Sequence, residues 1–268
     1  MAQNPKEWYV LVFYLLFYLK VLSLKSFIGW SIGIILVGAM FPFTIVLWLV
    51  SLPFDKDRRV IHTMINLNSF LIVHLIPLWK IKIEGKEKID KKRTYIIISN
   101  HQSILDILAI NTLFLRLKWV SKIENLKVPV LGWYLRMADY IVIDRSNPVS
   151  RNLFYGKANE FLKRGISIMM FPEGTRSLDR KIHTFKRGAF KLAIDNNVAI
   201  LPILIDGTGE ILPKKGRQLG DGQIIYLKVL DPILPSDFGT TDHDKLALDV
   251  FEMMKGQYEK SRKNHIWK

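Results

Sequence analysis

The stretch that decides the fold of this 268-residue chain reads Thr94-Tyr95-Ile96-Ile97-Ile98-Ser99-Asn100-His101-Gln102-Ser103-Ile104-Leu105-Asp106. Its first five residues are aromatic or β-branched, which predicts a buried strand that ends just before His101. After Ser103, apolar side chains recur at helical spacing, which predicts a helix that extends to about Arg116. The sequence therefore predicts a strand, a turn that carries a histidine, and a helix.

This turn can bring a histidine and an aspartate together. Inside a regular helix a five-residue step rotates the side chain by about 140°, so the two groups meet only if His101 lies in the turn and Asp106 in the first helical turn. Ser103 supports this arrangement, because Ser-x-x-Asp resembles a capping box with Ser103 as the N-cap residue. A carboxylate beside an imidazole fixes its tautomer and stabilises the imidazolium, as a general base requires. Alternatively, Asp106 only caps the helix and His101 only ends the strand.

The composition limits the classes of protein that the chain can form. Hydrophobic residues make up 49% and charged residues 24%, which fits one core domain with an additional element. The 39 Lys and Arg residues outnumber 24 Asp and Glu residues, a formal net charge of +15. Such an excess indicates an anionic partner, which is nucleic acid, a phospholipid surface or a phosphorylated substrate. The absence of cysteine excludes a disulfide framework, a thiolate metal site and a cysteine acyl intermediate.

The N-terminal segment has the composition of a membrane anchor. Between Trp8 and Phe54 the only charged residues are Lys20 and Lys25, and the uncharged part exceeds the ~20 residues that cross a bilayer. The apolar region is too long for a cleaved signal peptide, and Pro42 predicts a kink. We therefore expect residues 1–54 to form a membrane-embedded helical pair. The pair either dips into one leaflet or has a second helix that crosses the bilayer.

Residues 55–78 show the pattern of an amphipathic helix that links this anchor to the rest of the chain along the membrane surface. His62 and His74 are expected at its surface or at the interface. The basic residues that follow the anchor place that end in the cytoplasm by the positive-inside rule.

Residues 79–268 alternate short apolar strands with helical patterns, which predicts an α/β domain with a mixed sheet flanked by helices. Pro202 lies in one predicted strand and favours an edge strand or a bulge there. Expected strands cover residues 79–84, 94–98, 119–121, 140–143, 166–170, 198–205 and 223–230, and expected helices 103–116, 149–163, 185–193 and 243–268.

A second strand ends in a polar turn, which reads Phe171-Pro172-Glu173-Gly174-Thr175-Arg176. Ligands of α/β sheets bind beyond the carboxyl ends of strands. Backbone N–H groups near Gly174 and Thr175 are expected to face an anion, and the guanidinium of Arg176 suits phosphate. An ordinary loop with a solvated arginine is the alternative. Gly207-Thr208-Gly209 lacks the third glycine of a dinucleotide-binding loop, and we expect no such site there.

Together the two turns identify a family. Asn100-His101 with Asp106, followed by Phe171–Arg176, resembles the glycerolipid acyltransferases, specifically the 1-acyl-sn-glycerol-3-phosphate (lysophosphatidic acid) acyltransferase branch. The resemblance covers about residues 80–235. It continues in chain order through the stretches 140–145, 185–188 and 200–203.

This resemblance implies an enzyme that acylates the sn-2 hydroxyl of lysophosphatidic acid to phosphatidic acid. The co-substrate is acyl-CoA or acyl-carrier protein, and no metal or other cofactor is expected. His101 is then the general base and Asp106 orients it. The implied acceptor-phosphate residues are Glu173, Gly174, Thr175 and Arg176, with Lys122 and Arg145 as helpers. The implied partners are a phospholipid membrane, the acceptor and the donor, with the active site facing the cytoplasm and no nucleic acid bound.

Three alternatives stay open from the sequence. The acceptor could be another lysophospholipid or glycerol-3-phosphate, the chain could be a non-catalytic basic membrane-binding protein, or it could bind nucleic acid.

Overall fold

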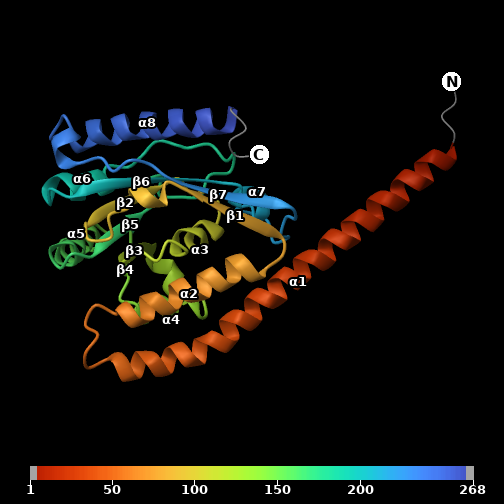
Figure 1. Ribbon diagram of the computed structural model, residues 1–268, viewed down its shortest axis with the longest axis horizontal. Coiled ribbons are helices and arrows are strands. Elements are labelled where there is room, and N and C mark those ends of the chain that lie inside the picture. Colours follow the sequence, from red (N-terminus) through yellow and green to blue (C-terminus); the bar gives the residue numbers. More distant parts are fainter. Residues whose placement is uncertain (1–4, 264–268) are drawn as a thin grey trace.

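A computed structural model describes the backbone of residues 5–263 and the side chains of residues 24–263. In this part of the chain a seven-stranded sheet lies between two layers of helices (Figure 1). The strand order is β1-β7-β6-β2-β5-β3-β4, and only the β6–β7 pair is antiparallel. The predicted mixed α/β sheet is therefore confirmed. The strands are β1 (Trp79–Glu84), β2 (Tyr95–Ser99), β3 (Leu117–Lys122), β4 (Ile141–Ile143), β5 (Ser167–Met170), β6 (Ala199–Asp206) and β7 (Gln223–Val229).

The helices divide between the two faces of the sheet. On one face α5, α6 and α8 cover the sheet, and on the other α2, α3 and α4 do, with α1 outside them (Figure 1). The helices are α1 (Pro5–Ser51), α2 (Arg59–Leu75), α3 (Leu105–Asn111), α4 (Leu131–Met137), α5 (Pro148–Lys163), α6 (Gly188–Asp195), α7 (Thr208–Ile211) and α8 (His243–Lys263), with short 3₁₀ turns at Lys86–Lys88, Ile123–Lys127 and Pro235–Asp237.

Strand β2 lies at the centre of the sheet and of both cores. Every one of its residues is buried. Because side chains alternate along a strand, Tyr95 and Ile97 join the core under α2, α3 and α4, whereas Ile96 and Ile98 join the core under α5, α6 and α8. Both neighbours of β2, which are β5 and β6, run parallel to it. The carboxyl ends of these three strands therefore meet at one edge of the sheet, where ligands of such sheets bind.

The helix after this strand is shorter than the sequence pattern suggested. α3 begins at Leu105 and ends at Asn111, and the residue at its N-cap position is Ile104 rather than Ser103. Half of the expected capping box exists, because the carboxylate of Asp106 accepts the N–H of Ser103 at 2.9 Å. The chain then turns away, and Phe114 takes a left-handed φ of 52°, which no helix allows.

Of the two alternatives for Pro202, the edge strand was wrong, because β6 lies between β2 and β7, but the pairing is irregular at this residue, as a bulge would require. The N–H and C=O groups of one residue point to the same side of a strand, and the carbonyl of Pro202 accepts the N–H of Leu230 at 3.0 Å. The side that lacks an N–H therefore faces the β7 side. There the β7 ladder begins only at Ile203, and a separate bridge joins Ile200 to Ile233. Because the pairing is irregular at Pro202, no regular ladder hydrogen bond requires an N–H from this residue.

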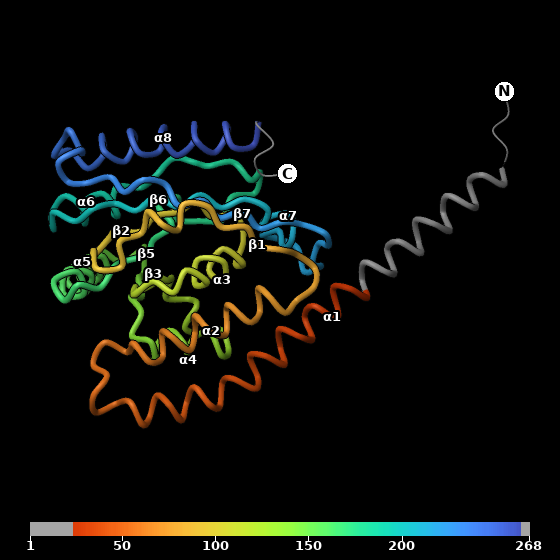
Figure 2. Tube along the Cα trace, in the orientation of Figure 1, coloured from red at the N-terminus to blue at the C-terminus, as the bar shows by residue number. Residues whose placement is uncertain are grey.

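The expected pair of helices within residues 1–54 was wrong, because the structure has one helix there. α1 is one continuous helix despite Pro42 in its interior, so the two apolar halves of residues 1–54 belong to one element. The side chains of the first half, Trp8 to Leu19, lie outside the described residues. The partner of α1 is α2, which occupies most of residues 55–78 and runs beside it (Figure 2).

One side of α1 is exposed and strongly apolar. The segment Leu24–Ser51 is 28 residues long and contains an 18-residue window with a mean hydropathy of 2.4, so it is long and apolar enough to cross a membrane. Large side chains such as Phe27 (69% exposed) and Ile34 (67% exposed) project away from the domain. On its other side α1 packs against the core through Ile32, Leu36, Val37, Phe41, Ile45 and Trp48. An apolar face of this extent indicates association with a membrane.

His62 contradicts the expectation of a surface position. Its side chain is buried between α2 and the sheet, with Nδ1 2.7 Å from the hydroxyl of Tyr140 and Nε2 2.7 Å from the carbonyl of Leu115. Burial lowers the pKa of His62 to about 4, so the ring is neutral at physiological pH. His74 is exposed, as predicted.

Candidate active site

The two residues of the central turn meet as predicted. Nδ1 of His101 lies 2.7 Å from Oδ2 of Asp106. The aspartate side chain is completely buried, whereas 15% of the histidine side chain is exposed. The His101 ring also stacks on the ring of Phe171, with centroids 3.7 Å apart and an angle of 5° between the planes. The carboxylate and the aromatic ring together fix the position of the imidazole, and Nε2 is the nitrogen that Asp106 leaves available.

Asp106 is held by more than its histidine. Its Oδ2 also accepts the backbone N–H groups of Gln102 at 2.7 Å and Ser103 at 2.9 Å. Its Oδ1 accepts the hydroxyl of Thr208 at 2.5 Å. Four donors therefore surround one buried carboxylate, and hydrogen bonds of this kind stabilise the charged form.

The sequence analysis missed Thr208, which belongs to the Gly207-Thr208-Gly209 stretch that was set aside. Gly207 has a φ of +86°, and a Cβ there would lie 2.0 Å from the carbonyl oxygen of Ile224. Only glycine fits this turn, which brings Thr208 beside Asp106 from the end of β6. A threonine three residues after the end of a predicted strand was the available signal.

A cavity of about 390 Å³ opens beside His101. One part of its wall is cationic, with Lys122 from β3, Arg145 after β4, Arg176 after β5 and Lys214 after α7. Within the described part of the chain none of these four forms an ion pair with a carboxylate, although many other basic residues of the protein do. The remaining wall is largely apolar, and it includes Ile65, Ile104, Ile107, Trp119, Leu131 and Leu135. The cavity can therefore accept a molecule with an anionic head and an apolar body.

The turn after β5 contributes to this cavity through Gly174, Thr175 and Arg176. The sequence analysis expected the Gly174 N–H to face an anion. In the structure this N–H is occupied, because it donates to the carbonyl of Phe171 at 3.0 Å. The Gly174 carbonyl accepts the guanidinium of Arg145. Among the described hydrogen bonds none engages the N–H of Thr175 or that of Arg176, which leaves amide donors in this turn.

Glu173 does not line the cavity. Its side chain is 5% exposed, Oε1 accepts the N–H of His101 at 2.9 Å, and Oε2 accepts the N–H of His183 at 3.1 Å. The carboxylate therefore ties the histidine turn to the loop after β5. This geometry replaces the expected contact between Glu173 and an acceptor phosphate, which a carboxylate would repel. Burial raises the pKa of Glu173 to about 7.

Glu173→Gln is expected to change the pH dependence of stability. Between pH 4.5 and 7 the folded protein binds the Glu173 proton more strongly than the unfolded chain does, so this group stabilises the fold less as the pH rises through 7. His62, whose lowered pKa makes the folded protein less stable as the pH falls below 6.5, is present in both proteins, so its effect cancels in the comparison. The wild type should therefore gain at most about 3 kcal/mol relative to the variant as the pH falls from 7 to 4.5. Thermal midpoints of the two proteins that stay parallel over this range would contradict the assignment.

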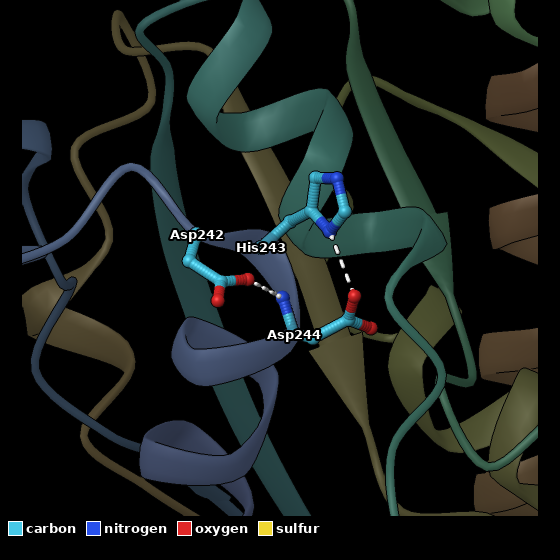
Figure 3. A group of neighbouring side chains, drawn as sticks. All are labelled: Asp242, His243 and Asp244. Carbon is cyan, nitrogen blue, oxygen red and sulfur yellow. Dashed lines mark hydrogen bonds and ion pairs between the residues drawn. The ribbon is translucent and has the colours of Figure 1, made fainter.

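Outside the cavity, Asp242, His243 and Asp244 place their ligand atoms within 4.8 Å of one another (Figure 3). One hydrogen bond and one ion-pair contact explain this grouping at the start of α8. Oδ1 of Asp242 accepts the N–H of Asp244 at 2.8 Å, and Nδ1 of His243 lies 3.3 Å from Oδ2 of Asp244. The group is a helix N-terminus with no contact to the cavity.

The fold and this site place the chain in the class of acyltransferases, whose family model, described as Acyltransferase, matches residues 80–206. The 1-acyl-sn-glycerol-3-phosphate acyltransferase of Limnanthes douglasii is 32% identical over 228 residues, which cover 82% of this chain and 78% of that protein. The crystal structure of the 1-acyl-sn-glycerophosphate (LPA) acyltransferase PlsC from Thermotoga maritima matches with a TM-score of 0.74 at 27% identity, and the match covers 90% of this chain and 95% of that one. The chain belongs to the 1-acyl-sn-glycerol-3-phosphate acyltransferase family.

Some relatives in this family are much longer. The chloroplastic 1-acyl-sn-glycerol-3-phosphate acyltransferase LPAT1 of Arabidopsis thaliana is 36% identical over 184 residues, which cover 67% of this chain. The chain spans 51% of the length of that relative.

Proposed function

We propose that the protein transfers an acyl group from a thioester, on coenzyme A or acyl carrier protein, to the sn-2 hydroxyl of lysophosphatidic acid, and so makes phosphatidic acid. One observation carries the proposal. The His101–Asp106 pair faces the same cavity as Arg176 and the other cations that lack a carboxylate partner. A base and a phosphate-binding region in one cavity are what the acylation of a phosphorylated alcohol requires.

The chemistry follows from the hydrogen bonds of His101. Because Asp106 accepts the Nδ1–H, Nε2 takes the proton of the acceptor hydroxyl as its oxygen attacks the thioester carbonyl carbon. The C–S bond then breaks, and the imidazolium returns the proton to the leaving thiolate. Asp106 stabilises the imidazolium between these two steps. A positioned base of this kind contributes about 10²–10⁴ in rate.

Two further features support direct transfer. Thr175 lines the cavity, and its N–H can donate to the oxyanion that forms on the thioester carbon. The chain has no cysteine, and its Gly-x-Ser-x-Gly stretch at Gly29–Gly33 lies inside helix α1, away from the cavity, rather than in a strand-to-helix turn that could carry a covalent acyl-enzyme. Since a thioester is already activated, the proposed reaction uses the donor as a co-substrate and draws on no metal or other cofactor.

The membrane position of the enzyme is part of the proposal. Contacts of α1 with the domain extend from Ser26, whose hydroxyl accepts the N–H of Leu219, to Trp48. Because the domain covers one side of α1 over this length, lipid cannot surround the helix there. This supports an anchor that lies in one leaflet rather than a helix that crosses the bilayer. The basic residues after α1 support a cytoplasmic active site. Recovery of the protein in the soluble fraction without detergent would contradict membrane anchoring.

The proposal is tested by measuring thiol release from acyl-CoA in the presence of lysophosphatidic acid. The purified protein should release thiol only when the acceptor is present, and phosphatidic acid should accumulate in equal amount. Competition between lysophosphatidic acid, glycerol-3-phosphate and other lysophospholipids identifies the preferred acceptor. Binding of anionic lipid vesicles without any thiol release, from either donor, would instead identify a non-catalytic membrane-binding protein.

Arg176→Ala is expected to raise the KM for lysophosphatidic acid about 10- to 100-fold, because a charge-assisted hydrogen bond contributes about 1.5–3 kcal/mol. The turnover number should change little, since the guanidinium binds the acceptor in the ground state as well as in the transition state. Arg187→Ala is the matched control, because Arg187 is exposed, pairs with Asp244 and does not line the cavity. A fall in kcat with an unchanged KM would remove Arg176 from the phosphate site.

A further inference from the structure

The segment Pro213–Asp221 follows α7 and reaches the cavity through Lys214, a residue that the sequence patterns did not single out. The ammonium group of Lys214 donates to the hydroxyl of Thr175 at 3.0 Å and to the carbonyl of Arg176 at 2.7 Å. Both acceptors are neutral. In the described structure no carboxylate pairs with Lys214, so these contacts hold the charge at the cavity without compensating it.

An ammonium group has three N–H donors. Two of the donors of Lys214 bind the turn that carries Arg176, and one donor is left for a ligand. The side chains of Arg176 and Lys214 therefore bring two positive charges to one part of the cavity wall. The lysine also fixes the backbone from which the arginine projects.

The segment that carries Lys214 is fastened to α1. The indole N–H of Trp30 donates to the carbonyl of Arg217 at 2.8 Å, and the N–H of Leu219 donates to the hydroxyl of Ser26 at 2.9 Å. Lys25 pairs with Asp221 at the end of the segment. These three contacts restrict the segment before any ligand arrives, which reduces the conformational entropy that binding would cost. Lys214 is thus preorganised at the cavity.

We propose that Lys214 is a further acceptor-binding residue that selects phosphomonoester head groups over phosphodiesters. The inference rests on the proposed function, because it concerns the acceptor of that same reaction. A phosphomonoester carries about −1.5 to −2 charge at pH 7, as phosphorylated side chains do, whereas a diester carries one negative charge. A second cation beside Arg176 attracts the more negative monoester more strongly than the diester. Lysophosphatidic acid has such a head group, and lysophosphatidylglycerol does not.

The experiment compares Lys214→Met with Lys215→Met. Methionine keeps an unbranched stem and removes the charge, and Lys215 is the exposed neighbour that does not line the cavity. With full-length protein in detergent micelles, K214M should raise the KM for lysophosphatidic acid about 10-fold, while kcat stays within about twofold. The KM for lysophosphatidylglycerol with the same acyl chain should rise less, so the preference for the monoester should fall. K215M should match the wild type, and Lys214→Arg should restore a KM near the wild-type value.

Three results would overturn the proposal. They are equal KM values for K214M and K215M, a loss confined to kcat, and a raised KM that K214R does not restore. The last two would indicate a purely structural lysine. If the wild type itself releases no thiol, the proposed function fails independently. Binding of lysophosphatidic acid to the solubilised proteins then decides the role of Lys214, because about 10-fold weaker binding to K214M than to K215M supports it and equal binding overturns it.

Discussion

Replacing His101 with alanine is expected to lower kcat for acyl transfer about 10²- to 10⁴-fold, the usual contribution of a positioned general base. The imidazole is the titratable side chain that Asp106 and Phe171 hold at the cavity wall. Its removal leaves the acceptor hydroxyl with no partner to take its proton. The cations that bind the acceptor are untouched, so the KM for lysophosphatidic acid should stay within a few-fold of the wild-type value. Thiol release measured at saturating acceptor isolates the change in kcat.

The control for this variant is His74→Ala. His74 is exposed on α2, away from the cavity, and its Nδ1 contacts only the backbone carbonyl of Phe70. Both variants should stay folded and unfold cooperatively, because the backbone bonds of His101 to Glu173 and Ser177 do not involve its ring. Turnover by His101→Ala at the rate of His74→Ala would remove the imidazole from the mechanism.

Local patterns predicted the sheet and the two turns well. The strand Trp79–Glu84 was predicted to the residue, because it alternates between apolar and charged side chains. His101 and Asp106 lie five residues apart, so the turn alone brings them together once the strand and the helix are recognised. Arg176 joins them because β5 runs parallel to β2, and parallel neighbours end at the same edge.

Contacts between distant segments explain what the sequence did not show. Thr208 meets Asp106 across 102 residues, and Lys214 meets Arg176 across 38. Neither contact is visible as a periodic pattern in the sequence, because each depends on where β6 lies in the sheet and on the path of the chain after it. His62 was assigned to the surface for the same reason. Its helical pattern is amphipathic, and the two groups that hydrogen-bond its ring lie 53 and 78 residues further along the chain.

The role of Glu173 was mispredicted for a different reason. The family resemblance marks the residues of a turn as a group, and it does not distinguish a side chain that faces the ligand from one that supports the turn. In this structure Arg176 lines the cavity, whereas the carboxylate of Glu173 points back to two backbone N–H groups. Only the direction of each side chain separates the two roles.

Asp106→Asn is expected to lower kcat by a similar factor, about 10²- to 10⁴-fold, although the side chain keeps its shape. The amide oxygen can replace Oδ2 and still accept from His101, Gln102 and Ser103. The amide NH₂ then faces Thr208, whose hydroxyl can turn to accept it. The geometry survives but the charge does not, so nothing stabilises the imidazolium that forms when His101 takes the proton. Asparagine is the informative replacement, because alanine would leave several buried donors without acceptors.

Asp179→Asn provides the matched control for this prediction. Asp179 also contacts a histidine, with Oδ1 2.8 Å from Nε2 of His183, but this pair is exposed and does not line the cavity. The control should keep the wild-type kcat, and both variants should keep the wild-type KM for lysophosphatidic acid. This result would show that the exposed Asp179–His183 pair does not serve the reaction. The loss in Asp106→Asn would then follow from the missing buried charge beside His101, the base that faces the acceptor. Equal rates for the two variants would instead show that the Asp106 carboxylate serves only the fold.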